Sequence, residues 1–332
     1  MSYSFKLDDK KCLFFDIFYK NGDIYLIMPI YNTVFLTEII KLFIYKDMNG
    51  GDENDNNNQQ LLISEKIVKD SYEPICIYKY PVIGSVSVSE SLKVKIIFNE
   101  CSQYYILNHI MESETNTLAL TTLFKDDYKL FPIFYDYYLK QGVAHFYMYY
   151  NGKISEEIAN VFNLPNVTLI EWDFAYWNGS DCKYKHHAQM GQLSDALYKY
   201  GKNRHKYMIF CDMDEYMFVK GTSLNAFVDM HPNVDVFGFQ NIWARTLDGK
   251  IPGSPIFPTE IFVASEKLRY NLRSKNIYKT SCLKIVGIHS SRDFCNEHQV
   301  IMLDNLDMFH FYNWSGVVRE EVCDVLMTVS IT

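Results

Sequence analysis

From about residue 113 onward, segments typical of β-strands alternate with segments typical of α-helices. Apolar runs predict strands at 118–124, 143–151, 166–172 and 205–218. Amphipathic runs between them predict helices at 126–142, 155–163 and 186–201. Ser155 is a suitable N-cap for the second helix, and Gly142 is a suitable end for the first. Strand–helix–strand units of this length form parallel sheets with right-handed crossovers, so we expect an α/β domain over residues 113–332.

Residues 1–112 have a different pattern, with short aromatic and β-branched runs that predict strands. These runs lie at 11–20, 23–32, 41–47, 73–82, 85–100 and 103–107. Asn21-Gly22 between the first two is a strong signal for a β-hairpin. The polar, low-complexity tract NGGDENDNNNQQ at 49–60 is predicted to be a loop. We therefore expect an all-β accessory domain over residues 1–112.

Composition excludes several classes of protein. A hydrophobic content of 48% is too high for a disordered chain, and a net charge of −8 argues against a protein that binds nucleic acid by neutralising phosphates. No apolar run approaches the roughly 18 residues of a membrane span, and the N-terminus lacks the pattern of a secretory signal, which predicts a soluble, cytoplasmic protein. The abundance of Asn, Lys, Ile and Tyr is typical of AT-rich genomes such as those of large DNA viruses. A viral protein would act in the host cytoplasm or the virion.

The strongest candidate for a functional site is the acidic segment Asp212-Met213-Asp214-Glu215. It follows the apolar run 207–211, and ligands of parallel sheets gather beyond the carboxyl ends of the strands. Carboxylates this close together repel one another, and a divalent cation that prefers oxygen ligands, Mg²⁺ or Mn²⁺, would relieve the repulsion. The alternative is a helix N-terminus at which the acids face the helix dipole.

Six sequence blocks resemble glycosyltransferase family 92 and its GT-A relatives of the glycosyltransferase-2-like group. The first is LTTLFKDDYKLFPIFYDYYLKQGVAHFYMYYN, the second AQMGQLSDALYKYG and the third HKYMIFCDMDEYMF, which ends in the D-x-D-E motif. FGFQNIWARTLDGK, PTEIF, and KTSCLKIVGIHS with MFHFYNWSG follow in the family's order. The resemblance covers about 113–318 and implies a GT-A fold, Rossmann-like with a mainly parallel sheet.

Two positions depart from the family's pattern. Tyr150 stands where an Asp usually precedes Asn151, and the usual K-N-E is Lys125-Asp126-Asp127. Both positions belong to the part of the fold that holds the base and ribose of the nucleotide, so an unusual donor is compatible with the sequence.

The resemblance implies a metal-dependent, inverting transfer of a sugar from a UDP-sugar to a glycan hydroxyl, with a galactose-like hexose favoured. Mn²⁺ or Mg²⁺ would be the cofactor. The implied metal ligands are Asp212, Asp214 and His310, with His289 as an alternative to the histidine. The nucleotide would be framed by Thr121, Leu123, Lys125, Asn151, Gln189 and Asp212.

An inverting reaction also needs a base for the acceptor hydroxyl. Glu260 in PTEIF matches a recurrent Glu of related sequences, and Asp248 in TLDGK is the alternative. Each could instead be an exposed loop acid. Trp243 is equally suited to stacking on an acceptor sugar or to a place in the core.

Two other functions compete with this interpretation. A haloacid-dehalogenase-type phosphatase also uses a D-x-D motif, but Met217 stands where that motif would end. A degenerate, non-catalytic sugar- or nucleotide-binding protein of the same fold would keep the architecture without turnover. Hydrolysis of a UDP-sugar would distinguish an active enzyme from such a non-catalytic protein.

Overall fold

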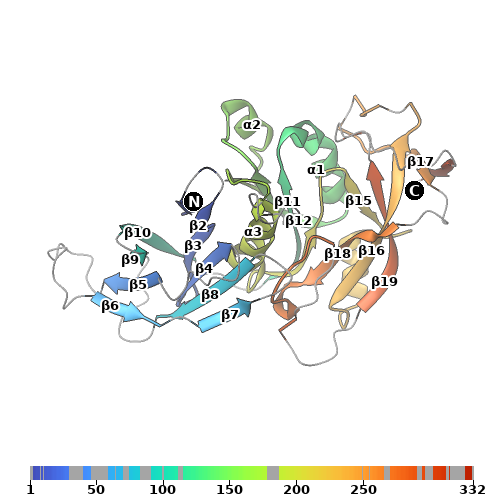
Figure 1. The fold of residues 1–332 in the computed structure, drawn as a ribbon. Helices are drawn as coiled ribbons and strands as arrows, with labels where there is room; N and C mark the ends of the chain where they lie inside the picture. Colours follow the sequence, from blue (N-terminus) through green and yellow to red (C-terminus); the bar gives the residue numbers. More distant parts are fainter. Residues whose placement is uncertain are drawn as a thin grey trace. The chain divides into compact units, whose positions relative to one another are not determined.

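The computed structural model divides the chain into two compact units (Figure 1). Unit 1 comprises Met1–Ser113 and Phe174–Lys199, and unit 2 comprises Glu114–Asp173 and Tyr200–Thr332. The structure describes residues 3–7, 9, 11–29, 40–45, 59–63, 65–69, 75–82, 91–98, 101–110, 115–177, 187–248, 250–253, 255–264, 270–289, 294–295, 302–311, 314 and 326–330. Most of the polar tract 49–60 lies outside these residues.

The core of unit 2 is a set of four adjacent parallel strands. In spatial order they are β13 (Val167–Glu171), β12 (Val143–Tyr150), β11 (Thr115–Phe124) and β14 (His205–Phe210). Every neighbouring pair is parallel, as the alternating pattern predicts. The chain runs from β11 outward to β13 and then returns to the other side of β11 with β14. The direction of winding therefore reverses between β11 and β14, and such a switch point is where α/β sheets bind ligands.

Beyond β14 the sheet is mixed, whereas a mainly parallel sheet was expected. The added strands are β18 (Tyr270–Lys279), β16 (Val236–Thr246), β17 (Glu260–Ala264), β20 (Leu326–Ser330), β19 (Met302–Phe311) and β15 (Glu215–Phe218). Among the described residues, only the β16–β19 pair of this set is parallel. The antiparallel pairs dominate here because the described residues between β16 and β19 contain no α-helical crossover of the kind that separates β11 to β14.

The run 205–218, expected as one strand, forms two strands with different neighbours. β14 pairs with β11 and β18, whereas β15 pairs with β19. The break lies in the acidic segment, where the Asp212 N–H donates to Glu215 Oε2 (2.8 Å) and the Glu215 N–H donates to the Asp212 carbonyl (3.1 Å). This turn ends the first strand because its hydrogen bonds replace those of the ladder.

Helices cover the parallel strands. They are the 3₁₀ turn η3 (Asp126–Leu130), α1 (Phe131–Lys140), α2 (Glu156–Val161), α4 (Leu224–Met230) and the 3₁₀ turn η6 (Thr280–Cys282). The Ser155 hydroxyl accepts the Ile158 N–H and caps α2, as predicted. Gly142 has φ +85°, the left-handed conformation expected after a helix. No helix of the described residues is long and apolar enough to cross a membrane.

In unit 1 the described elements before residue 111 are strands. They are β1 (Phe5–Lys6), β2 (Cys12–Phe14), β3 (Asp16–Lys20), β4 (Asp23–Pro29), β5 (Ile40–Tyr45), β6 (Gln59–Leu62), β7 (Glu65–Lys69), β8 (Ile75–Pro81), β9 (Ser91–Phe98) and β10 (Cys101–Ile110). Eight described strands form one sheet in the order β6-β5-β9-β10-β3-β4-β8-β7. Asn21 and Gly22 join β3 to β4 with φ 51° and 86°, which confirms the predicted hairpin. β6 and β7 were not expected.

Helix α3 (His187–Asp195) and the π-helical turn η4 (Ala196–Gly201) follow in sequence, and α3 packs on β4 and β8 in unit 1. A Cβ on Gly191 would lie 2.7 Å from the Phe15 ring, so only glycine permits this approach. The buried Lys199 Nζ lies 2.5 Å from Asp16 Oδ2, which is also buried. These contacts explain why 174–199 groups with unit 1 although the sequence analysis assigns it to the second domain.

Candidate functional site

The acidic segment lies at the switch point of unit 2, between the end of β14 and the start of β15. Its turn directs the side chains to different environments. The Asp212 side chain is 40% exposed, whereas the Asp214 side chain is 8% exposed and Glu215 is 2% exposed. One carboxylate therefore faces solvent and two lie within the protein.

Two basic side chains from neighbouring strands face these carboxylates. Lys275 of β18 places Nζ 2.9 Å from Asp212 Oδ2 and 3.4 Å from Glu215 Oε2. His310 of β19 places Nε2 3.4 Å from Asp214 Oδ2 and Nδ1 3.7 Å from Glu215 Oε1. Lys275 and His310 are both buried. The tertiary structure thus joins three strands, β14, β18 and β19, around the motif.

The orientation of the His310 ring is set by Asn241 of β16. His310 Nδ1 lies 2.7 Å from Asn241 Oδ1, an acceptor, so Asn241 favours a proton on Nδ1 when the ring is neutral. Nε2 is buried and has no hydrogen-bond partner among the described residues. Burial lowers the pKa of His310, but the nearby Asp214 and Glu215 outweigh burial and raise it. This arrangement leaves Nε2 directed toward Asp214.

Two acids near the switch point, Glu215 and Asp127, have a raised pKa and ionise less readily than ordinary carboxyls. Burial raises the pKa of Glu215 to about 7, in spite of Lys275, which lowers it. Burial raises the pKa of Asp127 to about 6, with further contributions from Asp214, Asp126 and Asp212. Asp127, in the turn after β11, is therefore close enough to the D-x-D-E motif for its charge to be repelled by the acids of the motif. The negative charges exceed the positive ones here, which favours a bound cation.

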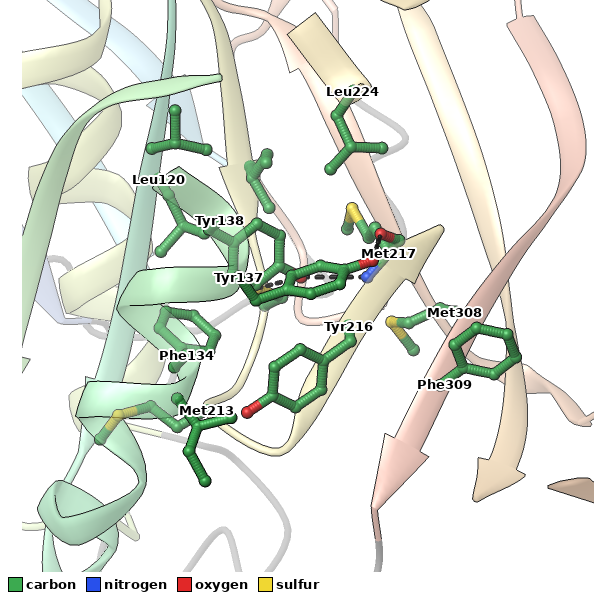
Figure 2. Close-up of a cluster of buried hydrophobic side chains, with 14 of the residues drawn as sticks. Leu120, Phe134, Tyr137, Tyr138, Met213, Tyr216, Met217, Leu224, Met308 and Phe309 are labelled. Carbon is green, nitrogen blue, oxygen red and sulfur yellow. Dashed lines mark hydrogen bonds between the residues drawn. The ribbon is translucent and has the colours of Figure 1, made fainter. Parts of the chain in front are cut away.

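Two tyrosines of α1 hold β15 in place (Figure 2). β19 pairs along one edge of β15, and the tyrosine hydroxyls reach its other polar groups. The Tyr138 hydroxyl donates to the Glu215 carbonyl (2.8 Å) and accepts the Met217 N–H (3.1 Å). The Tyr137 hydroxyl donates to the Met217 carbonyl (2.6 Å). Helix α1 therefore fixes the backbone that carries Glu215.

The donors present fit a divalent cation only in part. Among the described residues, no three His, Cys, Asp or Glu side chains are gathered as a preformed metal site. Asp214 Oδ2 and His310 Nε2, which lie 3.4 Å apart, nevertheless offer one carboxylate and one imidazole nitrogen side by side. A ligating histidine whose other nitrogen donates to an oxygen is the usual arrangement at metal sites. Asp212, the third ligand implied by the sequence, is paired with Lys275.

The expected nucleotide-binding residues of unit 2 lie at the ends of β11 and β12. Thr121 is buried, and its hydroxyl donates to the Tyr147 carbonyl on the neighbouring strand. Asn151 is also buried, and its side chain donates to the Trp172 carbonyl. Leu123 is half-buried, and Lys125 is exposed at the start of η3. Of these side chains, Lys125 is the one that solvent reaches most readily.

The remaining predicted residues have varied surroundings. Trp243 is buried, and its ring centroid lies 4.6 Å from the ring centroid of His310. The Arg273 guanidinium lies over the Trp243 ring, 5.5 Å from its centroid. Glu260 is exposed at the start of β17. Asp248 is exposed, and its pKa is lowered by the Lys250 N–H that its side chain accepts.

Two further predicted residues lie away from the motif's own contacts. Gln189 lies on α3 in unit 1, where it accepts the Tyr176 hydroxyl. His289 keeps part of its surface exposed, but partial desolvation of its ring, together with the nearby Lys275, lowers its pKa to about 4. Of the two candidate histidines, His310 is the one that contacts an acid of the motif.

Sequence reasoning missed Lys275 and Asn241, and it did not foresee the role of the α1 tyrosines. Lys275 lies in a strand of mixed composition, and its spacing of more than 60 residues from the motif carries no local signal. Gln240 and Asn241 interrupt the apolar run at 236–244 in β16. A polar position within such a run was the available signal, because a buried amide needs a polar partner.

Comparisons with known proteins give one family. Residues 118–321 match the model of glycosyltransferase family 92. No curated protein matches the sequence. An amylomaltase from Corynebacterium glutamicum is 11% identical with a TM-score of 0.19, over 41% of this chain and 20% of that one. A sialyltransferase from Photobacterium damsela is 12% identical with a TM-score of 0.17, over 57% and 34%. The chain thus spans about a fifth and a third of those two proteins, and neither similarity is high enough to indicate a shared fold.

Proposed function

The chain belongs to glycosyltransferase family 92, and we propose that it is a glycosyltransferase that moves a hexose from a UDP-sugar to a glycan hydroxyl. The proposed reaction is metal-dependent and inverting, on a fold of the GT-A type. One observation supports it above others: the acids Asp127, Asp212, Asp214 and Glu215 meet at the switch point between β11 and β14. The turn and Lys275 account for Glu215, and a cation with a diphosphate would account for the other acids.

The metal ligands in this proposal are Asp214 and His310, with Asp212 reaching both the metal and the ribose. A bound Mn²⁺ or Mg²⁺ would supply positive charge that stabilises the diphosphate as it leaves. In the neutral ring, which is the form that binds a metal, Asn241 favours the lone pair on Nε2, the atom beside Asp214. The α1 tyrosines hold the strand that follows, so the carboxylates need little reorganisation before substrate binds.

The nucleotide would lie along the ends of β11 and β12. Lys125 is exposed at the turn after β11, where its ammonium group can approach a phosphate. Thr121 and Asn151 are occupied by bonds within the sheet, so their role is to fix the strand ends that the nucleotide contacts. Leu123 would pack against the base.

Glu260 is the better candidate for the base that accepts the proton of the attacking hydroxyl. A useful base needs a pKa close to the working pH, and the Lys250 N–H lowers the pKa of Asp248. Asp248 is therefore better suited to hold the turn after β16. The Trp243 ring packs against the His310 ring and would hold that histidine in position.

A thermal shift assay tests the proposal directly. UDP with Mn²⁺ should raise the melting temperature more than either alone, because the metal and the diphosphate bind as one unit. At a hundredfold excess over Kd the expected stabilisation is about 2.7 kcal/mol. Asp214→Asn should abolish this joint effect and the release of UDP from a UDP-hexose. Asp136→Asn is the matched control, because Asp136 forms only a surface pair with Lys140. Equal stabilisation by GDP would refute the donor assignment.

A non-catalytic, nucleotide-binding protein is the second candidate. It is favoured by the Lys275–Asp212 ion pair, which neutralises one carboxylate of the motif without a metal. Such a protein would bind UDP but release no sugar from any UDP-hexose, with or without Mn²⁺. Turnover that Asp214→Asn abolishes would exclude it.

A further inference from the structure

Lys275 is a buried cation in the middle of the acidic motif. Its side chain is 3% exposed, and Nζ lies 2.9 Å from Asp212 Oδ2 and 3.4 Å from Glu215 Oε2. Glu215 Oε2 also accepts the Asp212 N–H. One ammonium group and one backbone amide thus hold both carboxylates in a single arrangement.

A lysine in this position is costly unless it acts on the carboxylates. Removing an ammonium group from water costs several kcal/mol, which only close opposite charges can offset. Lys275 lies on β18 opposite Phe239 of β16, which offers its ammonium group no charge, whereas Asp212 and Glu215 lie within 3.4 Å of Nζ. The charge is therefore directed at Asp212 and Glu215 rather than needed for packing.

Asp212 is the point of competition between Lys275 and a metal. Its side chain is 40% exposed and is the most accessible acid of the motif, whereas Lys275 approaches it from inside the protein. Asp214 has a different partner, His310. If a divalent cation bound to Asp214 and His310, Lys275 would already balance the charge of the neighbouring Asp212.

We propose that Lys275 is a positioning residue that acts as a built-in counter-cation, holding Asp212 and Glu215 in the metal-free protein and competing with the divalent cation for Asp212. This inference rests on the proposed function, because it assigns the strength of metal binding to one residue. Lys275 keeps the empty motif folded and lowers its affinity for free metal. Tight metal binding then requires the additional negative charge of the diphosphate.

The test is the melting temperature of the full chain over a titration with MnCl₂, without nucleotide. Lys275→Met removes the charge and keeps the unbranched stem. We expect a lower melting temperature without metal and a half-saturating Mn²⁺ concentration about tenfold below that of the wild type. Lys275→Arg keeps the charge and should restore the wild-type concentration. Lys279→Met is the matched control on the same strand, since Lys279 pairs with Asp235 instead.

The outcomes separate the inference from the proposed function. An unchanged half-saturating concentration in folded Lys275→Met, with a normal wild-type response, would overturn the inference and leave the function standing. A variant that responds to Mn²⁺ when the wild type does not would support the inference, and it would agree with the proposed joint binding of Mn²⁺ and UDP. No response in either protein would overturn the inference, whereas the proposed metal dependence is overturned only if the wild type also fails to respond to Mn²⁺ together with UDP.

A second pair of variants covers the case in which Lys275→Met does not fold. Glu215→Gln combined with Lys275→Met removes one buried charge of each sign, and it is compared with Glu215→Gln alone. The double variant should again be half-saturated at about tenfold less Mn²⁺, because Asp212 is then freed from the lysine. Equal concentrations for the two proteins would overturn the inference.

Discussion

Tyr138→Phe should destabilise unit 2 more than any other loss of a single hydroxyl from α1. The hydroxyl is fully buried, donates to the Glu215 carbonyl and accepts the Met217 N–H (Figure 2). Both are backbone groups of β15 that do not face β19 in the ladder. Phenylalanine keeps the ring and its packing but leaves the two groups without this partner.

The magnitude follows from counting the groups left unsatisfied. Each buried backbone group that loses its partner costs about 1–3 kcal/mol, so Tyr138→Phe should cost about 2–6 kcal/mol. Tyr137→Phe leaves only the Met217 carbonyl and should cost about half as much. Tyr135→Phe is the control on the same helix, because its hydroxyl reaches the half-exposed Asn166 side chain, and it should cost at most about 1 kcal/mol.

Urea unfolding followed by tryptophan fluorescence measures the three free energies of unfolding. Because the chain has two compact units, the midpoint and slope of each transition should be fitted separately. If Tyr138→Phe costs no more than Tyr135→Phe, the hydroxyl does not satisfy the edge of β15, and the argument that α1 positions the acidic segment is wrong.

Three more predictions concern other parts of the chain. Asp16→Asn should cost about 3–5 kcal/mol of unfolding free energy in urea, because it leaves the buried Lys199 without its carboxylate, and adding Lys199→Met should restore most of the loss. Asp127 has a pKa of about 6 in the folded protein, above its ordinary value, so its ionisation lowers the unfolding free energy as pH rises through that value. The unfolding free energy of Asp127→Asn relative to the wild type should therefore increase by roughly 1 kcal/mol between pH 5 and 7.5, allowing for partial exposure. A difference that shrinks as pH rises would refute this sign. Gly142→Ala should lower the melting temperature by several degrees, since φ is +85° and the new Cβ would lie 2.6 Å from the Asn225 Cβ; an unchanged value would refute the clash.

The regular elements were largely predictable because their signals are local. Ser155, Gly142 and Asn21-Gly22 each mark a cap or turn through their own backbone preferences, and each is confirmed at its position. The parallel pairing of the first four strands of unit 2 also follows from local spacing, since a helix between two strands imposes it.

Other features of the fold depend on contacts between distant residues. The run 205–218 has the composition of one strand, and its division into β14 and β15 depends on the Glu215 side chain, which accepts a backbone N–H within the turn. The grouping of 174–199 with unit 1 depends on Phe15 and Asp16, which lie more than 150 residues earlier. Neither partner leaves a signal in the segment itself.

The candidate site shows the same division. The sequence by itself determined the family and the position of Asp212 and Asp214 at the end of a strand, because the acids are adjacent in the chain and follow an apolar run. Only the tertiary structure decided which charges surround them. Lys275 and His310 reach the motif through the pairing of β14 with β18 and β15 with β19. The energy of a buried charge depends on its neighbours in space, and sheet pairing brings together residues whose separation in sequence carries no information about that contact.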